Sequence, residues 1–138
     1  MKEIGGYFQL ESFVGESYHS QALKLNLARN SLLYVLEAKA ANKIYIPYFL
    51  CDSVSKALQS INCEFEYYFV DDKFEPLLEK ELLTHEYLLL VNYYGFFDEN
   101  RIKNLQNKHQ RLIVDNTQAF FAMPVKGTDT FYSCRKFF

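Results

Sequence analysis

Short apolar runs that alternate with amphipathic segments are the feature that most constrains how this chain can fold. The most apolar run covers residues 87–91, and Leu112, Ile113 and Val114 form another. These runs are too short for buried helices, which favours strands that are buried on both faces. Such strands occur in parallel sheets covered by helices, so the pattern predicts an α/β fold with three layers, α/β/α, around a mostly parallel central sheet.

The remaining elements follow from the same two periodicities. Alternating or apolar runs predict strands, and apolar residues at helical spacing predict helices. Asp98 is expected to cap one helix, and residues 1–18 are expected to form an irregular arm. The predicted strands are 22–27, 43–47, 63–70, 87–91, 112–114 and 130–134, and the predicted helices are 30–41, 52–62, 75–83 and 99–109.

Composition narrows the class of protein. The 138 residues suffice for one domain with a real core. A net charge of -2 without any run of Lys or Arg argues against a nucleic-acid surface. No stretch reaches the length of a membrane span, and residues 1–11 lack the apolar region of a signal peptide, so we expect a cytoplasmic protein. Three cysteines at unrelated spacings fit a reducing compartment and no metal site.

Polar groups stand where two of the predicted strands end. Asp115 follows the apolar run 112–114, and the strand 130–134 leads to Ser133, Arg135 and Lys136. Ligands of open α/β sheets bind beyond the carboxyl ends of the strands, so a carboxylate and an amine are expected at one rim. Taken singly, such an Asp is more often a turn or cap residue, and such a Lys is more often a solvated surface charge.

The segments DNTQA, residues 115–119, and FYSCRK, residues 131–136, resemble the core of the fold-type-I pyridoxal phosphate enzymes. The likeness is greatest to the sugar-nucleotide aminotransferases of the DegT/StrS type. The resemblance implies that Asp115 pairs with the protonated pyridine nitrogen, that Gln118 packs on the cofactor, and that Lys136 forms the Schiff base and acts as general base. An anion beside the ring nitrogen keeps it protonated, and the protonated ring is the electron sink.

The resemblance also implies a wider cofactor site. Phe49 would stack on the pyridine ring, although in so aromatic a chain a single Phe is more often a core residue. The turn at Ala28, Arg29 and Asn30 would bind the phosphate, because free amides at a helix N-terminus favour an anion. Ser133 would also hold the phosphate, and Asn92 would lie near the phenolic oxygen. The chain departs from the family at Ala28, where glycine is usual, at Asn92, where histidine is more common, and at Phe131, where many members have serine.

The family likeness implies a function and an alternative to it. The first expectation is a homodimeric aminotransferase that moves an amino group from an amino acid, often glutamate, to a keto-sugar nucleotide. Residues 1–138 resemble only the N-terminal half of such enzymes, as a single large domain that is incomplete at its C-terminus. The alternative is therefore a catalytically inactive remnant, or half of a split enzyme, that acts as a structural or interaction domain and lacks the cofactor. In the family the strand after the lysine fills the sheet, and without it two strand edges would be exposed.

Overall fold

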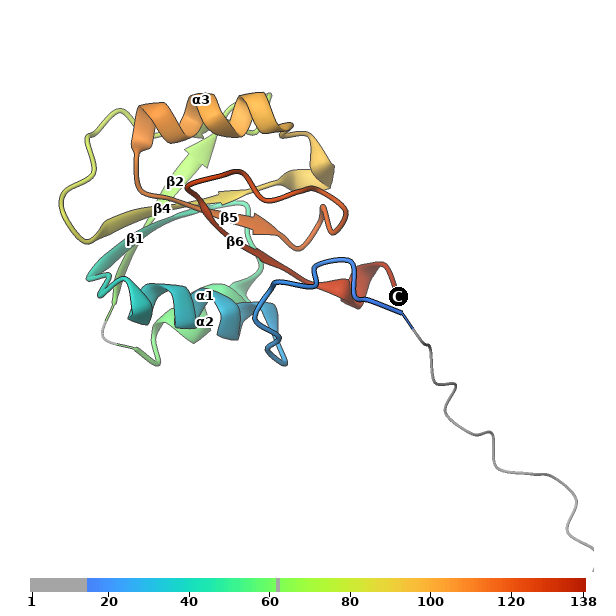
Figure 1. The fold of residues 1–138 in the computed structure, drawn as a ribbon. Helices are drawn as coiled ribbons and strands as arrows, with labels where there is room; N and C mark the ends of the chain where they lie inside the picture. Colours follow the sequence, from blue (N-terminus) through green and yellow to red (C-terminus); the bar gives the residue numbers. More distant parts are fainter. Residues whose placement is uncertain (1–14, 62) are drawn as a thin grey trace, which may run out of the picture.

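A six-stranded sheet organises the protein (Figure 1). The computed structural model describes residues 15–61 and 63–138, so most of the predicted N-terminal arm lies outside the described residues. The strand order is β3-β2-β1-β4-β5-β6. In chain order the elements are α1 (Ala28–Ala38), β1 (Lys43–Pro47), α2 (Asp52–Leu58), β2 (Glu64–Val70), β3 (Pro76–Leu77), β4 (Glu86–Val91), the 3-10 turn η1 (Tyr93–Gly95), α3 (Glu99–His109), β5 (Leu112–Asn116), β6 (Asp129–Tyr132) and the 3-10 turn η2 (Cys134–Lys136).

The sheet is parallel except at one edge. Strand β1 pairs in parallel with β2 and β4, β4 with β5, and β5 with β6, whereas the two-residue β3 runs antiparallel to β2. Helices α1 and α2 cover one face and α3 covers the other (Figure 1). The predicted three-layer architecture with a mostly parallel sheet is therefore confirmed.

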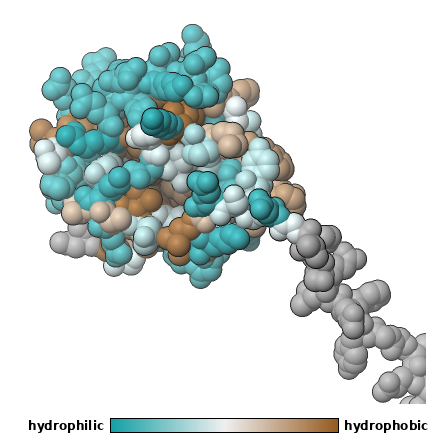
Figure 2. Space-filling view, viewed as in Figure 1, coloured by the Kyte–Doolittle hydropathy of each residue, from teal (hydrophilic) through white to brown (hydrophobic). Residues whose placement is uncertain are grey.

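The core has two apolar layers, one on each side of the sheet. Leu32 and Leu36 of α1, one helical turn apart, pack with Val54 and Leu58 of α2 against one face. Ile102 and Leu105 of α3 pack against the other face. The outer side of α3 is polar, and the surface above it in Figure 2 is mostly hydrophilic. No helix among residues 15–61 and 63–138 has both the length and the apolar character needed to cross a membrane.

The strand predicted at 22–27 is wrong. These residues form bends and irregular structure, and Leu23 and Leu25 are exposed. Alternation of apolar and polar residues predicts a strand only where a neighbouring strand supplies backbone partners, and this segment pairs with none of the six.

The helix predicted at 75–83 is also wrong. The Oδ1 atom of Asp71 accepts the backbone N–H groups of Lys73 at 2.9 Å and Glu75 at 2.7 Å, which reverses the chain in a tight turn. Phe74 within this turn has a positive φ of 64°. The chain then leaves the turn extended, and Pro76 of β3 pairs with Val70 of β2.

Candidate functional site

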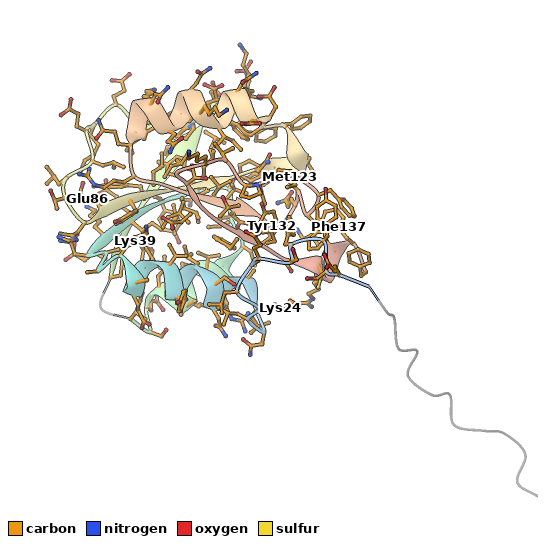
Figure 3. The ribbon with its side chains drawn as sticks, viewed as in Figure 1. Lys24, Lys39, Glu86, Met123, Tyr132 and Phe137 are labelled. Atoms are coloured by element: carbon orange, nitrogen blue, oxygen red, sulfur yellow. The ribbon has the colours of Figure 1, made fainter. Side chains whose placement is uncertain are left out.

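A cavity of about 990 Å³ lies at the carboxyl ends of the strands, between the start of α1, the end of β6 and the segment 17–27. The rim is the one expected for a ligand site in a parallel sheet. In Figure 3, Tyr132 at this rim lies at the opposite end of the sheet from Lys39 and Glu86. The cavity brings together most of the residues predicted for the site: Ala28, Arg29, Phe49, Asp115, Gln118, Ser133 and Lys136.

Asp115 supplies a buried carboxylate to this cavity. Its residue is only 4% exposed, at the end of β5, where it lies in register with Val91 and Phe131 of the flanking strands. One carboxylate oxygen accepts the backbone N–H of Thr117 at 2.8 Å. Burial raises the pKa of Asp115, while the hydrogen bonds from Thr117 and the positive charge of Lys136 oppose that rise. A buried carboxylate of this kind gains from a cationic or hydrogen-donating partner in the cavity.

Lys136 lines the same cavity as Asp115 from the last residue of η2. It is exposed to solvent. Ser133 precedes η2 and accepts the backbone N–H of Arg135 at 3.4 Å. Because the Ser133 hydroxyl acts as acceptor in this contact, its hydrogen is free to be donated into the cavity.

The first residues of α1 present backbone amides to the cavity. Leu27 at the N-cap makes no side-chain hydrogen bond to the helix, and the first turn contains no acidic residue. The orphan amides of a helix start and the cation of Arg29 together favour an anion here. Asn30 does not line the cavity, and its side-chain amide donates to the side-chain oxygen of Asn26 at 2.8 Å.

Phe49 places an aromatic ring at the cavity, and Tyr93 supports it. The Phe49 residue is 58% exposed, whereas Tyr93 is 2% exposed. The two rings stack with centroids 5.4 Å apart and planes at 30°. The Tyr93 hydroxyl donates to the backbone oxygen of Phe49 at 2.6 Å. Sequence reasoning missed Tyr93, which was visible only as one of two tyrosines after the strand 87–91.

Asn92 does not lie in the cavity, although it was predicted to lie near the cofactor. It is fully buried, and its amide nitrogen donates to the backbone oxygen of Phe97 at 3.2 Å and to the side chain of Asn116 at 3.0 Å. Its side-chain oxygen accepts the Phe97 backbone N–H at 2.9 Å. With these contacts Asn92 secures the turn that follows β4, because each of its polar groups already has a partner within the protein.

The segment around Tyr18 and His19 also lines the cavity and was not predicted as part of the site. The Nε2 atom of His19 lies 2.6 Å from the backbone oxygen of Phe120, and the Tyr18 hydroxyl donates to the backbone oxygen of Phe121 at 3.1 Å. The His19 ring stacks on Tyr132 at 3.8 Å. These contacts join segments about a hundred residues apart in the chain. Local sequence patterns cannot predict contacts between such distant segments.

Comparison with known proteins shows a likeness in structure and none in sequence. No protein-family profile matches the chain, and no curated protein sequence matches it. Among solved structures, tyrosine aminotransferase from Leishmania infantum is similar to this chain with a TM-score of 0.47 and 19% sequence identity. The similarity covers 62% of this chain and spans 28% of that aminotransferase. The α/β/α architecture assigned above rests on the sheet topology and not on this likeness.

Proposed function

We propose that this chain is a pyridoxal phosphate-binding domain of the aminotransferase type, with Lys136 as the residue that bonds to the cofactor. The observation that carries the proposal is that the buried carboxylate of Asp115 and the amine of Lys136 line the same cavity. When bound, pyridoxal phosphate supplies an electron sink for reactions at the α-carbon of an amino acid.

The residues around the cavity fit the chemical groups of this cofactor. Asp115 is buried without a full counter-charge, and a protonated ring nitrogen would stabilise it as a charged hydrogen-bond donor. The uncapped start of α1 offers amides to a phosphate. The aromatic face of Phe49 is exposed and offers a surface for a flat ring. The donor set thus matches an anion, a cationic nitrogen and a planar ring in one ligand.

Each residue then has a defined task. Asp115 holds the proton on the ring nitrogen, Phe49 and Gln118 pack on the ring, and Lys136 provides the amine. Ser133, Arg29 and the backbone at Ala28 bind the phosphate. Lys136 would also serve as the general base that moves a proton, because it lines the cavity with Asp115 and its positive charge acts on that buried carboxylate.

We propose amino transfer from an amino acid, such as glutamate, to a keto-sugar nucleotide as the reaction, by a cytoplasmic homodimer. An excess of cations around the cavity supports an anionic substrate, since Lys24, Arg29 and Arg135 line it together with Lys136. The DegT/StrS-like segments 115–119 and 131–136 carry the choice of substrate class.

A second candidate is a domain that does not catalyse and acts through binding alone. Two observations favour it. Lys136 is exposed to water, and solvation weakens an amine as a nucleophile. Within the described residues β6 pairs only with β5, so its outer edge borders the cavity without a strand beside it.

Titration with pyridoxal phosphate separates the two candidates. The protein is mixed with the cofactor, its visible absorbance is recorded, and borohydride reduction followed by peptide mass mapping locates the attached pyridoxyl group. Specific binding predicts a saturable spectral change and modification at Lys136 that Lys136→Ala abolishes. Lys126→Ala is the matched control, since Lys126 is exposed and lies outside the cavity. Modification that spreads over surface lysines, and that persists equally in Lys136→Ala, would exclude the first candidate and leave the binding domain.

A further inference from the structure

Phe49 has little packing of its own to fix its ring. Its residue is 58% exposed and follows the last residue of β1 by two positions. Among the described residues, the Phe49 ring stacks on the ring of Tyr93, and the Phe49 backbone oxygen accepts a hydrogen bond from the Tyr93 hydroxyl. The place of the Phe49 ring at the cavity thus depends on a second side chain.

We propose that Tyr93 is a positioning residue that fixes Phe49 as the wall on which a planar ligand ring packs. The inference rests on the proposed function and deepens it, because it names the group that sets the ring-binding geometry. One side chain acts on Phe49 twice: the hydroxyl holds the backbone oxygen at 2.6 Å, and the ring lies 5.4 Å from the Phe49 ring. Hydroxyl and ring together restrict both the backbone and the side chain of Phe49.

Tyr93 is itself held from behind by further aromatic rings. The centroid of Phe74 lies 5.0 Å from that of Tyr93, and Phe96 stacks on Phe74 at 5.8 Å with planes at 12°. Offset and tilted pairs at these separations are favourable. Tyr93 is thus enclosed between the exposed Phe49 and a second layer of rings.

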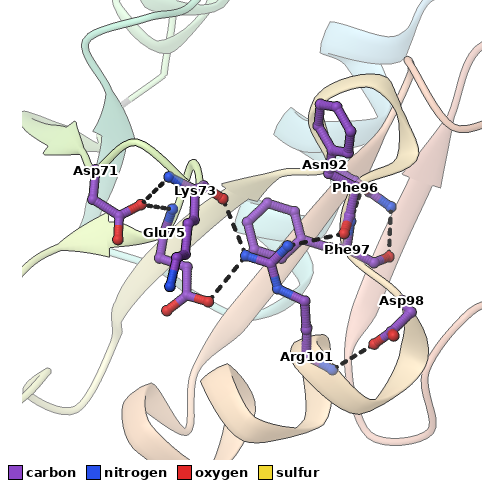
Figure 4. Close-up of polar contacts among 8 residues, drawn as sticks. All are labelled: Asp71, Lys73, Glu75, Asn92, Phe96, Phe97, Asp98 and Arg101. Atoms are coloured by element: carbon purple, nitrogen blue, oxygen red, sulfur yellow. Dashed lines mark hydrogen bonds and ion pairs between the residues drawn. The ribbon is translucent and has the colours of Figure 1, made fainter.

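Arg101 of α3 fastens the loops that carry this second layer (Figure 4). Its guanidinium donates to the backbone oxygens of Phe96 and Lys73, each at 3.0 Å, and forms an ion pair with Glu75 at 3.0 Å. The same group lies 4.4 Å from the centre of the Phe97 ring. The planar fork of arginine allows these contacts at once, so the two loops have a fixed spacing.

The phenol of Tyr93 remains a donor over the working pH range. Burial raises its pKa, and the negative charge of Asp115 raises it further. A neutral phenol has one hydrogen to give, and the backbone oxygen of Phe49 receives it. Tyr93 lines the cavity together with Asp115 and Phe49. It therefore lies among the groups that would surround a bound ring.

The first arm of the test reads the order of residue 49 without any ligand. The chain contains no tryptophan, so Phe49→Trp introduces a unique tryptophan, which is excited at wavelengths where the tyrosines do not absorb. Loss of a hydrogen bond of this kind shifts a local equilibrium by about fivefold. We expect the double variant Phe49→Trp with Tyr93→Phe to show stronger acrylamide quenching and lower fluorescence anisotropy than Phe49→Trp alone.

Tyr68→Phe is the matched control. Tyr68 is also buried, and its hydroxyl donates to the backbone oxygen of Leu89 at 2.6 Å, but it does not line the cavity. Both substitutions remove one oxygen atom and retain the ring. Equal quenching of the introduced tryptophan in the Tyr93→Phe and Tyr68→Phe backgrounds would overturn the inference, because the effect would then be one of general stability.

The second arm measures pyridoxal phosphate affinity from the visible spectrum. We expect Tyr93→Phe to raise the dissociation constant about fivefold and to weaken the induced circular dichroism of the bound chromophore, with Tyr68→Phe unchanged in both. If the unsubstituted protein takes up no pyridoxal phosphate, the proposed function fails, and the fluorescence arm still decides whether Tyr93 positions residue 49. An unchanged dissociation constant in Tyr93→Phe, in a protein that binds the cofactor, contradicts the inference directly.

Discussion

The side-chain amide of Asn92 donates to the side-chain oxygen of Asn116 at 3.0 Å and thereby ties the end of β4 to the end of β5. Both residues are buried, and Asn92 also makes two hydrogen bonds with the backbone of Phe97.

Asn92→Ala removes three hydrogen bonds and leaves buried polar groups without partners, so we expect a loss of about 3 kcal/mol in the free energy of unfolding. Urea denaturation measures it. Asn30→Ala, which removes a single exposed contact with Asn26, is the control and should change stability little. A small effect of Asn92→Ala would show that the turn after β4 does not need this residue.

The fold was predictable where the signals were local. The helix predicted at 99–109 coincides with α3, and Asp98 caps it as expected by accepting the Arg101 backbone N–H at 2.8 Å. The strand predicted at 43–47 coincides with β1, because a continuous apolar run ending in proline specifies both its burial and its end.

Other features depended on partners far along the chain and could not be predicted. The segment 22–27 has the alternation of a strand, yet whether it joins the sheet is decided by the strand edge available to it. Asn92 and Tyr93 are adjacent after β4, and only the packing of the surrounding loops determines that one side chain turns inward to Asn116 while the other reaches Phe49. The motif 115–119 identified Asp115 as a candidate but could not reveal its degree of burial.

Asp115→Asn should stabilise the protein at neutral pH. Burial raises the pKa of the Asp115 carboxyl in the folded state above its ordinary value of 3.8, so the buried charge destabilises the fold at pH values above the folded-state pKa. This penalty shrinks as the pH falls and disappears below 3.8, where both states are protonated. Asparagine keeps an oxygen for the Thr117 N–H and carries no charge, so we expect a gain of about 1 kcal/mol at pH 7.

Urea denaturation of Asp115→Asn and the unsubstituted protein at several pH values tests this expectation. The gain should be largest at neutral pH and should vanish near pH 3, while uptake of pyridoxal phosphate should weaken. Greater stability of the unsubstituted protein at pH 7 would mean that the attraction of Lys136 and the Thr117 hydrogen bonds exceed the cost of burial.

His109 should make the fold less stable in mild acid. The residue is buried at the end of α3, and burial together with the charge of Lys108 lowers its pKa from the ordinary value of 6.5. The unfolded chain therefore takes up a proton before the folded protein does, so the free energy of unfolding falls as the pH drops below 6.5.

Thermal melting between pH 7 and pH 5 measures the slope of stability against pH. His109→Phe should reduce it, whereas His85→Gln, at an exposed histidine, should leave it unchanged. Equal slopes in all three proteins would assign the acid sensitivity to other groups.

Arg101→Lys should loosen the two loops that carry Lys73 and Phe96, although the charge is retained. The guanidinium contacts Phe96, Lys73 and Glu75 together, and a lysine amine cannot reach all three in that geometry. We expect a loss of about 2 kcal/mol in stability and faster amide hydrogen exchange in residues 71–75 and 93–97. Lys103→Ala on the same helix removes only an exposed ion pair with Glu99 and should change neither quantity. Unchanged exchange in the Arg101 variant would show that the loops are held by their aromatic packing alone.

The two margins of the sheet differ in what they offer to an added strand. On one side the two residues of β3 pair only with Phe69 and Val70, so among the described residues 64–68 of β2 have no strand on their outer side. On the other side β6 contributes four residues, of which Thr130, Phe131 and Tyr132 border the cavity. A peptide that extended the sheet along β6 would therefore compete with a small molecule for the same opening, whereas a peptide paired with residues 64–68 of β2 would leave that opening accessible.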